Sequence, residues 1–94
     1  MLRFHAEWCI ACKEMEAYTF TDATVKQTLA GFVLLQADVT QQLAANKELM
    51  RKFNLIGPPA ILFFNGEQQE SHALRVIGYQ DAKTFIKVLQ QVRL

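Results

Sequence analysis

Hydrophobic and polar residues along the chain predict four strands. Residues 2–6 alternate between apolar and polar side chains, which is typical of a half-buried strand. Residues 32–39 form a continuous apolar run of strand length and predict a strand covered on both faces of a sheet. Residues 60–64 and 74–77 are the other two predicted strands, and Asn65-Gly66 between them is a strong turn signal for a hairpin.

The segments between these strands predict four helices. Residues 10–18 are good helix formers, and Asp22 is the predicted N-cap of a short second helix that ends at Gly31. Two longer helices are predicted to begin at the N-caps Thr40 and Asp81. Their inward faces are Leu43, Leu49, Met50 and Phe53 in the first, and Phe85, Ile86, Leu89 and Val92 in the second. The predicted order is β-α-α-β-α-β-β-α.

Composition narrows the class of protein. A chain of 94 residues allows one domain, and 51% hydrophobic with 20% charged residues excludes a disordered chain. The net charge of +1 gives no basic excess, so we expect no nucleic-acid partner. The longest apolar runs, 29–35 and 57–64, are too short to cross a bilayer, so we expect no direct membrane insertion and place any export or tethering signal outside these residues.

The chemistry is concentrated in Cys9 and Cys12, the only two cysteines. A disulfide closing so short a loop restrains little of the unfolded chain, so a purely structural bridge is disfavoured. Zinc normally takes four ligands, and His5 and His72 lie at no ligand-like spacing from the pair. Redox chemistry is therefore the favoured interpretation, and no metal site is expected. A thiolate module that binds a soft ion such as Cu(I) remains the alternative.

A helix that opens at Cys9 directs its free N–H groups and positive dipole end at the sulfur, which favours the thiolate. Spacing of i, i+3 places Cys12 on the same face, near enough to form a disulfide. We expect Cys9 to be exposed and to attack a partner, and Cys12 to lie deeper and resolve the mixed disulfide. Ile10 and Ala11 bring no charge between the cysteines, which favours a reductant.

The motifs together resemble a known family. They are residues 6–14 (Ala-Glu-Trp-Cys-Ile-Ala-Cys-Lys-Glu), 18–20 (Tyr-Thr-Phe), 34–40 (Leu-Leu-Gln-Ala-Asp-Val-Thr), Pro59, 61–64, Gly78 and 81–82. The chain resembles thioredoxin-fold domains, in particular the C-terminal periplasmic domains of the DsbD family of bacterial thiol:disulfide interchange proteins. The resemblance implies an α/β thioredoxin-like fold, with a central mixed β-sheet flanked by helices. It also implies that residues 1–94 are one domain of a longer membrane-tethered protein, lacking the strand and helix that usually precede the cysteine-bearing strand.

The resemblance also implies a function. It predicts a monomeric protein-disulfide reductase in the periplasm that relays electrons from a membrane-embedded domain to an N-terminal periplasmic domain of the same protein. Reduction pathways for disulfide isomerases and cytochrome c maturation would lie downstream. No cofactor is implied beyond the redox-active Cys9–Cys12 disulfide. The alternatives are a free-standing thioredoxin-like reductase and the non-enzymatic metal-binding module.

Two charged residues are expected to modulate the cysteine pKa. Related domains place a carboxylate at the position of Glu16 close to the cysteines, where it would raise the thiol pKa and could relay a proton. They commonly carry a buried Asp six residues before the first cysteine, where this chain has Arg3. Arg3 either faces the cysteines and lowers their pKa, or reaches solvent.

Five residues are expected to bind a partner, and the two prolines among them are assigned by resemblance. Trp8 and Ile10 flank Cys9, with Trp8 either filling the core or forming a flat apolar surface for partner peptides. Phe20 either packs in the core or shields the sulfur. Pro59 is the proline that faces the active site, with a cis peptide bond. Pro58 has no N–H, so one docking hydrogen bond that relatives make is missing here.

Overall fold

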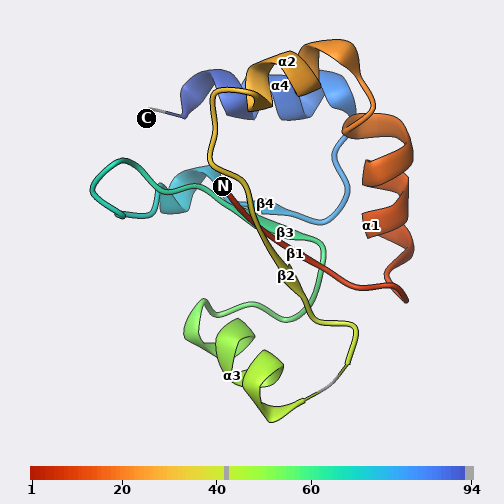
Figure 1. The fold of residues 1–94 in the computed structure, drawn as a ribbon, viewed down its shortest axis with the longest axis vertical. Coiled ribbons are helices and arrows are strands. Elements are labelled where there is room, and N and C mark those ends of the chain that lie inside the picture. The colour runs from red at the N-terminus through yellow and green to blue at the C-terminus, as the bar shows by residue number, and fades with distance from the viewer. Residues whose placement is uncertain (42, 93–94) are drawn as a thin grey trace.

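The computed structural model describes residues 1–41 and 43–92, in which a four-stranded sheet lies between helices (Figure 1). The strands are β1 (Leu2–His5), β2 (Leu35–Asp38), β3 (Ala60–Leu62) and β4 (Val76–Ile77), in the order β2-β1-β3-β4. Strand β1 pairs in parallel with β2 and antiparallel with β3, and β3 pairs antiparallel with β4. The sheet is therefore mixed, as the resemblance implied.

Helices cover both faces of this sheet. They are α1 (Ile10–Glu14), the π-type turn η1 (Met15–Thr19), α2 (Ala23–Leu29), α3 (Ala44–Lys52), the short 3-10 turn η2 (His72–Leu74) and α4 (Ala82–Gln91). Helices α2 and α4 lie side by side on one face, and α3 lies alone on the opposite face (Figure 1). The observed order of elements matches the predicted one.

Strand β3 separates two apolar clusters, because its side chains alternate between the faces of the sheet. Ile61 and Phe63 pack against η1, α2 and α4, whereas Ala60 and Leu62 pack on the other face against α3. The first cluster contains Met15, Val25, Leu29, Ile61, Phe63, Val76, Phe85 and Leu89. The second contains Phe4, Ala6, Cys9, Cys12, Val39, Ala60 and Leu62. The cysteine pair is thus part of the α3-side core.

The structure corrects the prediction for residues 32–39. Only Leu35–Asp38 form β2, and this strand lies at the edge of the sheet with β1 as its single neighbour. Val33, Leu34 and Leu35 are exposed, so the run is not covered on both faces. A continuous apolar run indicates a strand, but the side chains alone do not specify how many neighbours the strand has.

The predicted helix from Thr40 to Phe53 is also shorter than expected. Helix α3 begins at Ala44 after Leu43, which provides no side-chain cap. Thr40 does not cap it, because its hydroxyl is bonded to Asp38 and to the backbone N–H of Glu7. Leu43 is exposed rather than inward-facing, whereas Leu49, Met50 and Phe53 pack against the α3-side core as predicted.

Other boundaries differ in smaller ways. The predicted helix 10–18 consists of α1 followed by η1, where the N–H of Phe20 bonds the carbonyl of Met15, five residues back. The strand expected at 74–77 is β4 alone, and the strand expected at 60–64 ends at Leu62. The N-caps Asp22 and Asp81 are confirmed, since each carboxylate accepts backbone N–H bonds from the first turn of its helix.

Candidate active site

The cysteine pair lies where β1 passes into α1. Cys9 has extended backbone angles (φ −88°, ψ 105°) and is the N-cap of the helix. Its Sγ accepts a hydrogen bond from the backbone N–H of Cys12 at 3.1 Å. This bond satisfies one of the N–H groups that a helix start leaves free, and it points a donor at the sulfur. The expected environment for a stabilised Cys9 thiolate is therefore present.

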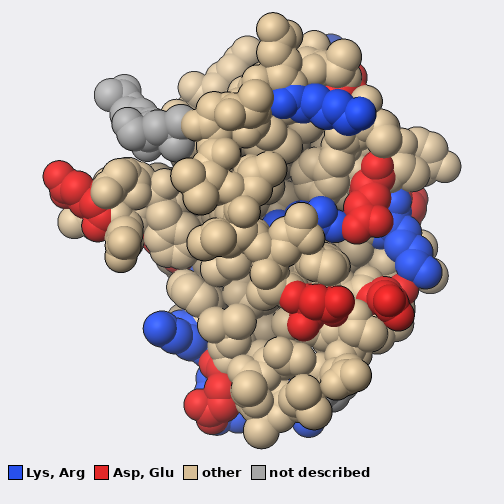
Figure 2. All heavy atoms as spheres, viewed as in Figure 1, with Lys and Arg blue, Asp and Glu red and all other residues tan. Residues whose placement is uncertain are grey.

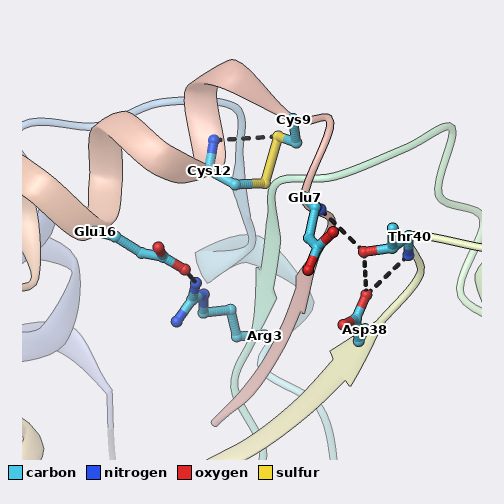
Figure 3. Close-up of a disulfide and its surroundings, with 7 residues drawn as sticks. All are labelled: Arg3, Glu7, Cys9, Cys12, Glu16, Asp38 and Thr40. Carbon is cyan, nitrogen blue, oxygen red and sulfur yellow. Dashed lines mark hydrogen bonds and ion pairs between the residues drawn. A yellow bond between two sulfur atoms is a disulfide. The ribbon is translucent and has the colours of Figure 1, made fainter.

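Cys9 and Cys12 form a disulfide, with their Cα atoms 5.2 Å apart (Figure 3). This separation lies within the usual range for a disulfide. The expected difference in exposure is not seen: Cys9 is 6% and Cys12 is 3% exposed. Both cysteines belong to the α3-side core, where the disulfide joins their sulfurs.

The proline pair lies beside the residues that lead into Cys9. In the antiparallel pairing of β1 with β3, Phe4 is opposite Ala60. Pro58 and Pro59 directly precede Ala60, so they lie at the end of the sheet where β1 leads towards the cysteines. The Pro58–Pro59 peptide bond is cis, as the resemblance implied. Pro59 is buried and Pro58 half-buried.

The residues expected to contact a partner separate into two groups. Trp8 is 53% exposed and its indole N–H donates to the carbonyl of Thr40 at 2.8 Å, so it forms a fixed surface rather than filling the core. Ile10 is also exposed. Phe20 instead packs edge-on against Phe85, with ring centroids 5.7 Å apart, and joins the cluster beneath α4. Phe20 is half-buried and packs against this core, which favours the packing alternative.

Arg3 and Glu16 bond to each other. Their guanidinium and carboxylate groups form an ion pair between β1 and η1 (Figure 3). Arg3 is opposite Ile61 in the sheet, so its side chain points to the face that η1 covers. It is only 13% exposed, with its guanidinium 4.9 Å from the centroid of the Phe20 ring. The prediction that Arg3 reaches solvent is therefore wrong, and the Glu16 carboxylate is bound by the Arg3 guanidinium.

The sequence interpretation missed a polar network on the other side of Cys9. The Asp38 carboxylate accepts from both the backbone N–H and the hydroxyl of Thr40, and the Thr40 hydroxyl oxygen accepts from the N–H of Glu7 at 2.9 Å (Figure 3). The Thr40 bonds hold the pKa of Asp38 below its ordinary value. With the Trp8–Thr40 bond, this network fixes the segment that leads into the cysteines. The Asp-x-Thr sequence at the end of the predicted strand could have indicated this network, because an Asp side chain commonly bonds the backbone two residues on.

The remaining charges give no concentrated patch on the face shown in Figure 2, where acidic and basic side chains are interspersed. Within residues 1–41 and 43–92, no three His, Cys, Asp or Glu side chains converge as a metal site would require. Over the same residues, no helix is both long and apolar enough to cross a membrane.

A family model described as a thioredoxin-like domain matches residues 1–93. The structure also superposes on the oxidised C-terminal domain of DsbD from Neisseria meningitidis with a TM-score of 0.86 and 34% sequence identity. That match covers 98% of this chain and 78% of the solved domain. The chain belongs to the thioredoxin-like family, among the DsbD C-terminal domains.

Other comparisons agree with this membership. The thiol:disulfide interchange protein DsbD of Ralstonia nicotianae is 48% identical over 91 residues, and that of Yersinia pestis is 50% identical over 90 residues. The match covers 97% and 96% of this thioredoxin-like chain but 15% of each DsbD protein. A thioredoxin from Thermus thermophilus superposes with a TM-score of 0.80 at 26% identity, over 96% of this chain and 69% of that one.

Proposed function

We propose that this domain is a protein-disulfide reductase that exchanges dithiol and disulfide through Cys9 and Cys12. The observation that carries the proposal is the disulfide at the start of α1, with a backbone N–H donated to the Cys9 sulfur. Interchange proteins of the same family, 48–50% identical here, support it. The uncharged Ile10-Ala11 pair between the cysteines favours the reducing direction.

The reaction balances without a cofactor. In the reduced domain, the Cys9 thiolate attacks one sulfur of a partner disulfide, forms a mixed disulfide and releases the partner's other sulfur as a thiolate. Cys12 then loses its proton, and its thiolate attacks the Cys9 sulfur. The partner leaves with two thiols, the Cys9–Cys12 disulfide forms, and two electrons have moved to the partner. The N–H of Cys12 stabilises charge on Cys9 whenever Cys9 is the thiolate.

The test is a stopped-flow measurement on pre-reduced protein mixed with insulin, whose disulfides are the probe. Wild type should reduce insulin, and one Cys9–Cys12 disulfide should form for each insulin disulfide that is reduced. Cys9→Ser should abolish the reaction, whereas Glu14→Gln, an exposed change on the same helix, should leave it intact. Reaction at the wild-type rate in Cys9→Ser would overturn the proposal.

We further propose that the partners are other domains of the same membrane-tethered, periplasmic protein. The support is that the chain spans 15% of the length of its DsbD relatives. Expressing the natural full-length protein with Cys12→Ala and identifying the peptides cross-linked to Cys9 by mass spectrometry would test this. Peptides from the same polypeptide are expected, and peptides from unrelated proteins alone would favour a free-standing reductase.

Exposed apolar residues at the edge of β2 support the proposal that the natural domain contains a further strand. Val33, Leu34 and Leu35 are exposed there, and hollows of ≈310 and ≈720 Å³ on either side both include Met1 and Leu35 in their walls. We infer that preceding residues of the natural protein add the strand that the resemblance implies. Extending the chain by its natural N-terminal residues should slow amide exchange in β2, and unchanged exchange would contradict this.

A further inference from the structure

A partly buried ion pair far from the cysteines in sequence lies at the root of the proline loop, which we define as residues 54–59. The Arg75 guanidinium donates to both carboxylate oxygens of Glu70, at 2.5 and 2.8 Å. The two side chains are only 13% and 15% exposed. These bonds hold the pKa of the Glu70 carboxyl below its ordinary value. A two-pronged pair of this kind fixes the orientation of the guanidinium.

The third Arg75 bond reaches another element. Its Nη1 donates to the carbonyl oxygen of Phe53 at 2.6 Å. Phe53 is the C-terminal cap of α3, where backbone carbonyls lack helical partners, so a cation is well placed to satisfy one. The proline loop begins at the next residue, Asn54, which has φ of +57°. Arg75 therefore fixes the point at which the loop leaves α3.

The same short strand holds the other end of the loop. The N–H of Gly78 donates to the carbonyl of Pro59 at 3.0 Å. Arg75 and Gly78 flank β4 (Val76–Ile77), so one segment holds both ends of the proline loop. Between these ends the Ile56 side chain is fully exposed. Leu55 packs against the α3-side core and Pro59 is buried, so the loop has fixed ends and presents Ile56 to solvent. Such a loop is suited to presenting an apolar surface to a partner.

We propose that Arg75, oriented by Glu70, is a positioning residue that holds the proline loop for docking of a polypeptide partner. This inference rests on the proposed reductase function and adds the residue that controls access of a large substrate. The hydrogen bonds of Arg75 go to Glu70 and Phe53 and to neither cysteine. We therefore expect Arg75 to act on docking and to leave the sulfur chemistry unchanged. A small disulfide needs no docking surface, and its reduction should not depend on Arg75.

The experiment compares two substrates with pre-reduced protein: insulin and the small aromatic disulfide 5,5′-dithiobis(2-nitrobenzoate). Arg75→Met should lower the second-order rate constant for insulin roughly tenfold, because small misplacements of a docking surface cost large factors in rate. The rate constant for the small disulfide should stay within about twofold of the wild-type value. The redox potential of Cys9–Cys12 should equal that of wild type within error. Arg75→Lys keeps the charge without the two-pronged geometry and should recover only part of the insulin rate.

Arg51→Met is the matched control. Arg51 lies in the last turn of α3, 80% exposed, in a loose 3.7 Å pair with Glu48. Its removal should leave both rates unchanged. Amide exchange at residues 55–57 provides a second measurement, and it should accelerate in Arg75→Met but not in Arg51→Met.

The outcomes separate the two proposals. Equal slowing of both substrates, or no change in the insulin rate with folded Arg75→Met, would overturn the positioning role. If Arg75→Met does not fold, Glu70→Gln provides the same comparison, because it removes the charge that orients Arg75. If wild type reduces neither substrate, the reductase proposal fails. Unchanged amide exchange at residues 55–57 in Arg75→Met would independently refute the link between Arg75 and the loop.

Discussion

Arg3 on β1 and Glu16 on η1 form an ion pair, and Arg3 also stacks on the ring of Phe20. Considered separately, the two charges would act on the cysteines with opposite sign. As a pair they neutralise each other at one point between the sheet and the cysteine-bearing helix. The pairing changes what single substitutions should do, because each removal exposes the charge of the other.

We therefore predict a non-additive mutant cycle at this pair. Arg3→Met should raise the pKa of the Cys9 thiol by leaving a carboxylate alone, and Glu16→Gln should lower it by leaving a cation alone. Both shifts should be small and should weaken with added salt, because Glu16 is half exposed and water screens its charge. Thiolate absorbance against pH would measure both.

The double variant Arg3→Met with Glu16→Gln should return close to wild type. Glu16→Gln alone should also be the stronger oxidant, because a lower thiol pKa stabilises the reduced form. If all three variants titrate like wild type, the pair has only a structural role, and the assignment of the cysteines is unaffected.

The two cysteines should differ in mixed-disulfide trapping. Cys12→Ala should accumulate a covalent complex with a disulfide-containing partner, because nothing remains to resolve it, whereas Cys9→Ala should not. The two cysteines are almost equally buried in the disulfide, so a difference in exposure would not explain a difference in trapping. The experiment therefore tests the position of Cys9 as the helix N-cap. Non-reducing gel electrophoresis measures it, and equal trapping by both variants would refute the distinct roles.

The Glu70–Arg75 pair should make stability depend on acid pH. The folded pKa of Glu70 lies below its ordinary value of about 4.3, so the pair stabilises the fold fully above that pH. The contribution is lost as pH falls through the lowered folded pKa. Free energies of unfolding for wild type and Glu70→Gln should differ at pH 7, and the difference should shrink as the pH falls below about 4. A constant difference across that range would contradict the ion-pair contribution.

Gly78 should resist substitution. Its φ of +85° is disfavoured for residues with a Cβ, and it holds Pro59 through its N–H. Gly78→Ala should lower the free energy of unfolding by about 1–2 kcal/mol. Gly66→Ala is the control, since Gly66 has no positive φ and no heavy atom lies within 4 Å of the position that a Cβ would take. Equal urea midpoints for the two variants would show that Gly78 is not required for its conformation.

Local features of the sequence predicted much of the fold. Asp22 and Asp81 mark helix starts because their side chains bond N–H groups two or three residues away. The Cys9–Cys12 spacing likewise places both sulfurs within reach through a single helical turn. Each of these inferences needs only contacts close in sequence, which is why it could be made from the chain alone.

Contacts distant in sequence decided the rest. Thr40 could have capped a helix, but Asp38 and Glu7 bond its hydroxyl once β1 and β2 lie side by side. Whether Arg3 faced the cysteines or solvent depended on which helix covers its side of the sheet. Only the tertiary structure brings Glu16 to Arg3 and Arg75 to Phe53, because these partners are 13 and 22 residues apart and meet through packing.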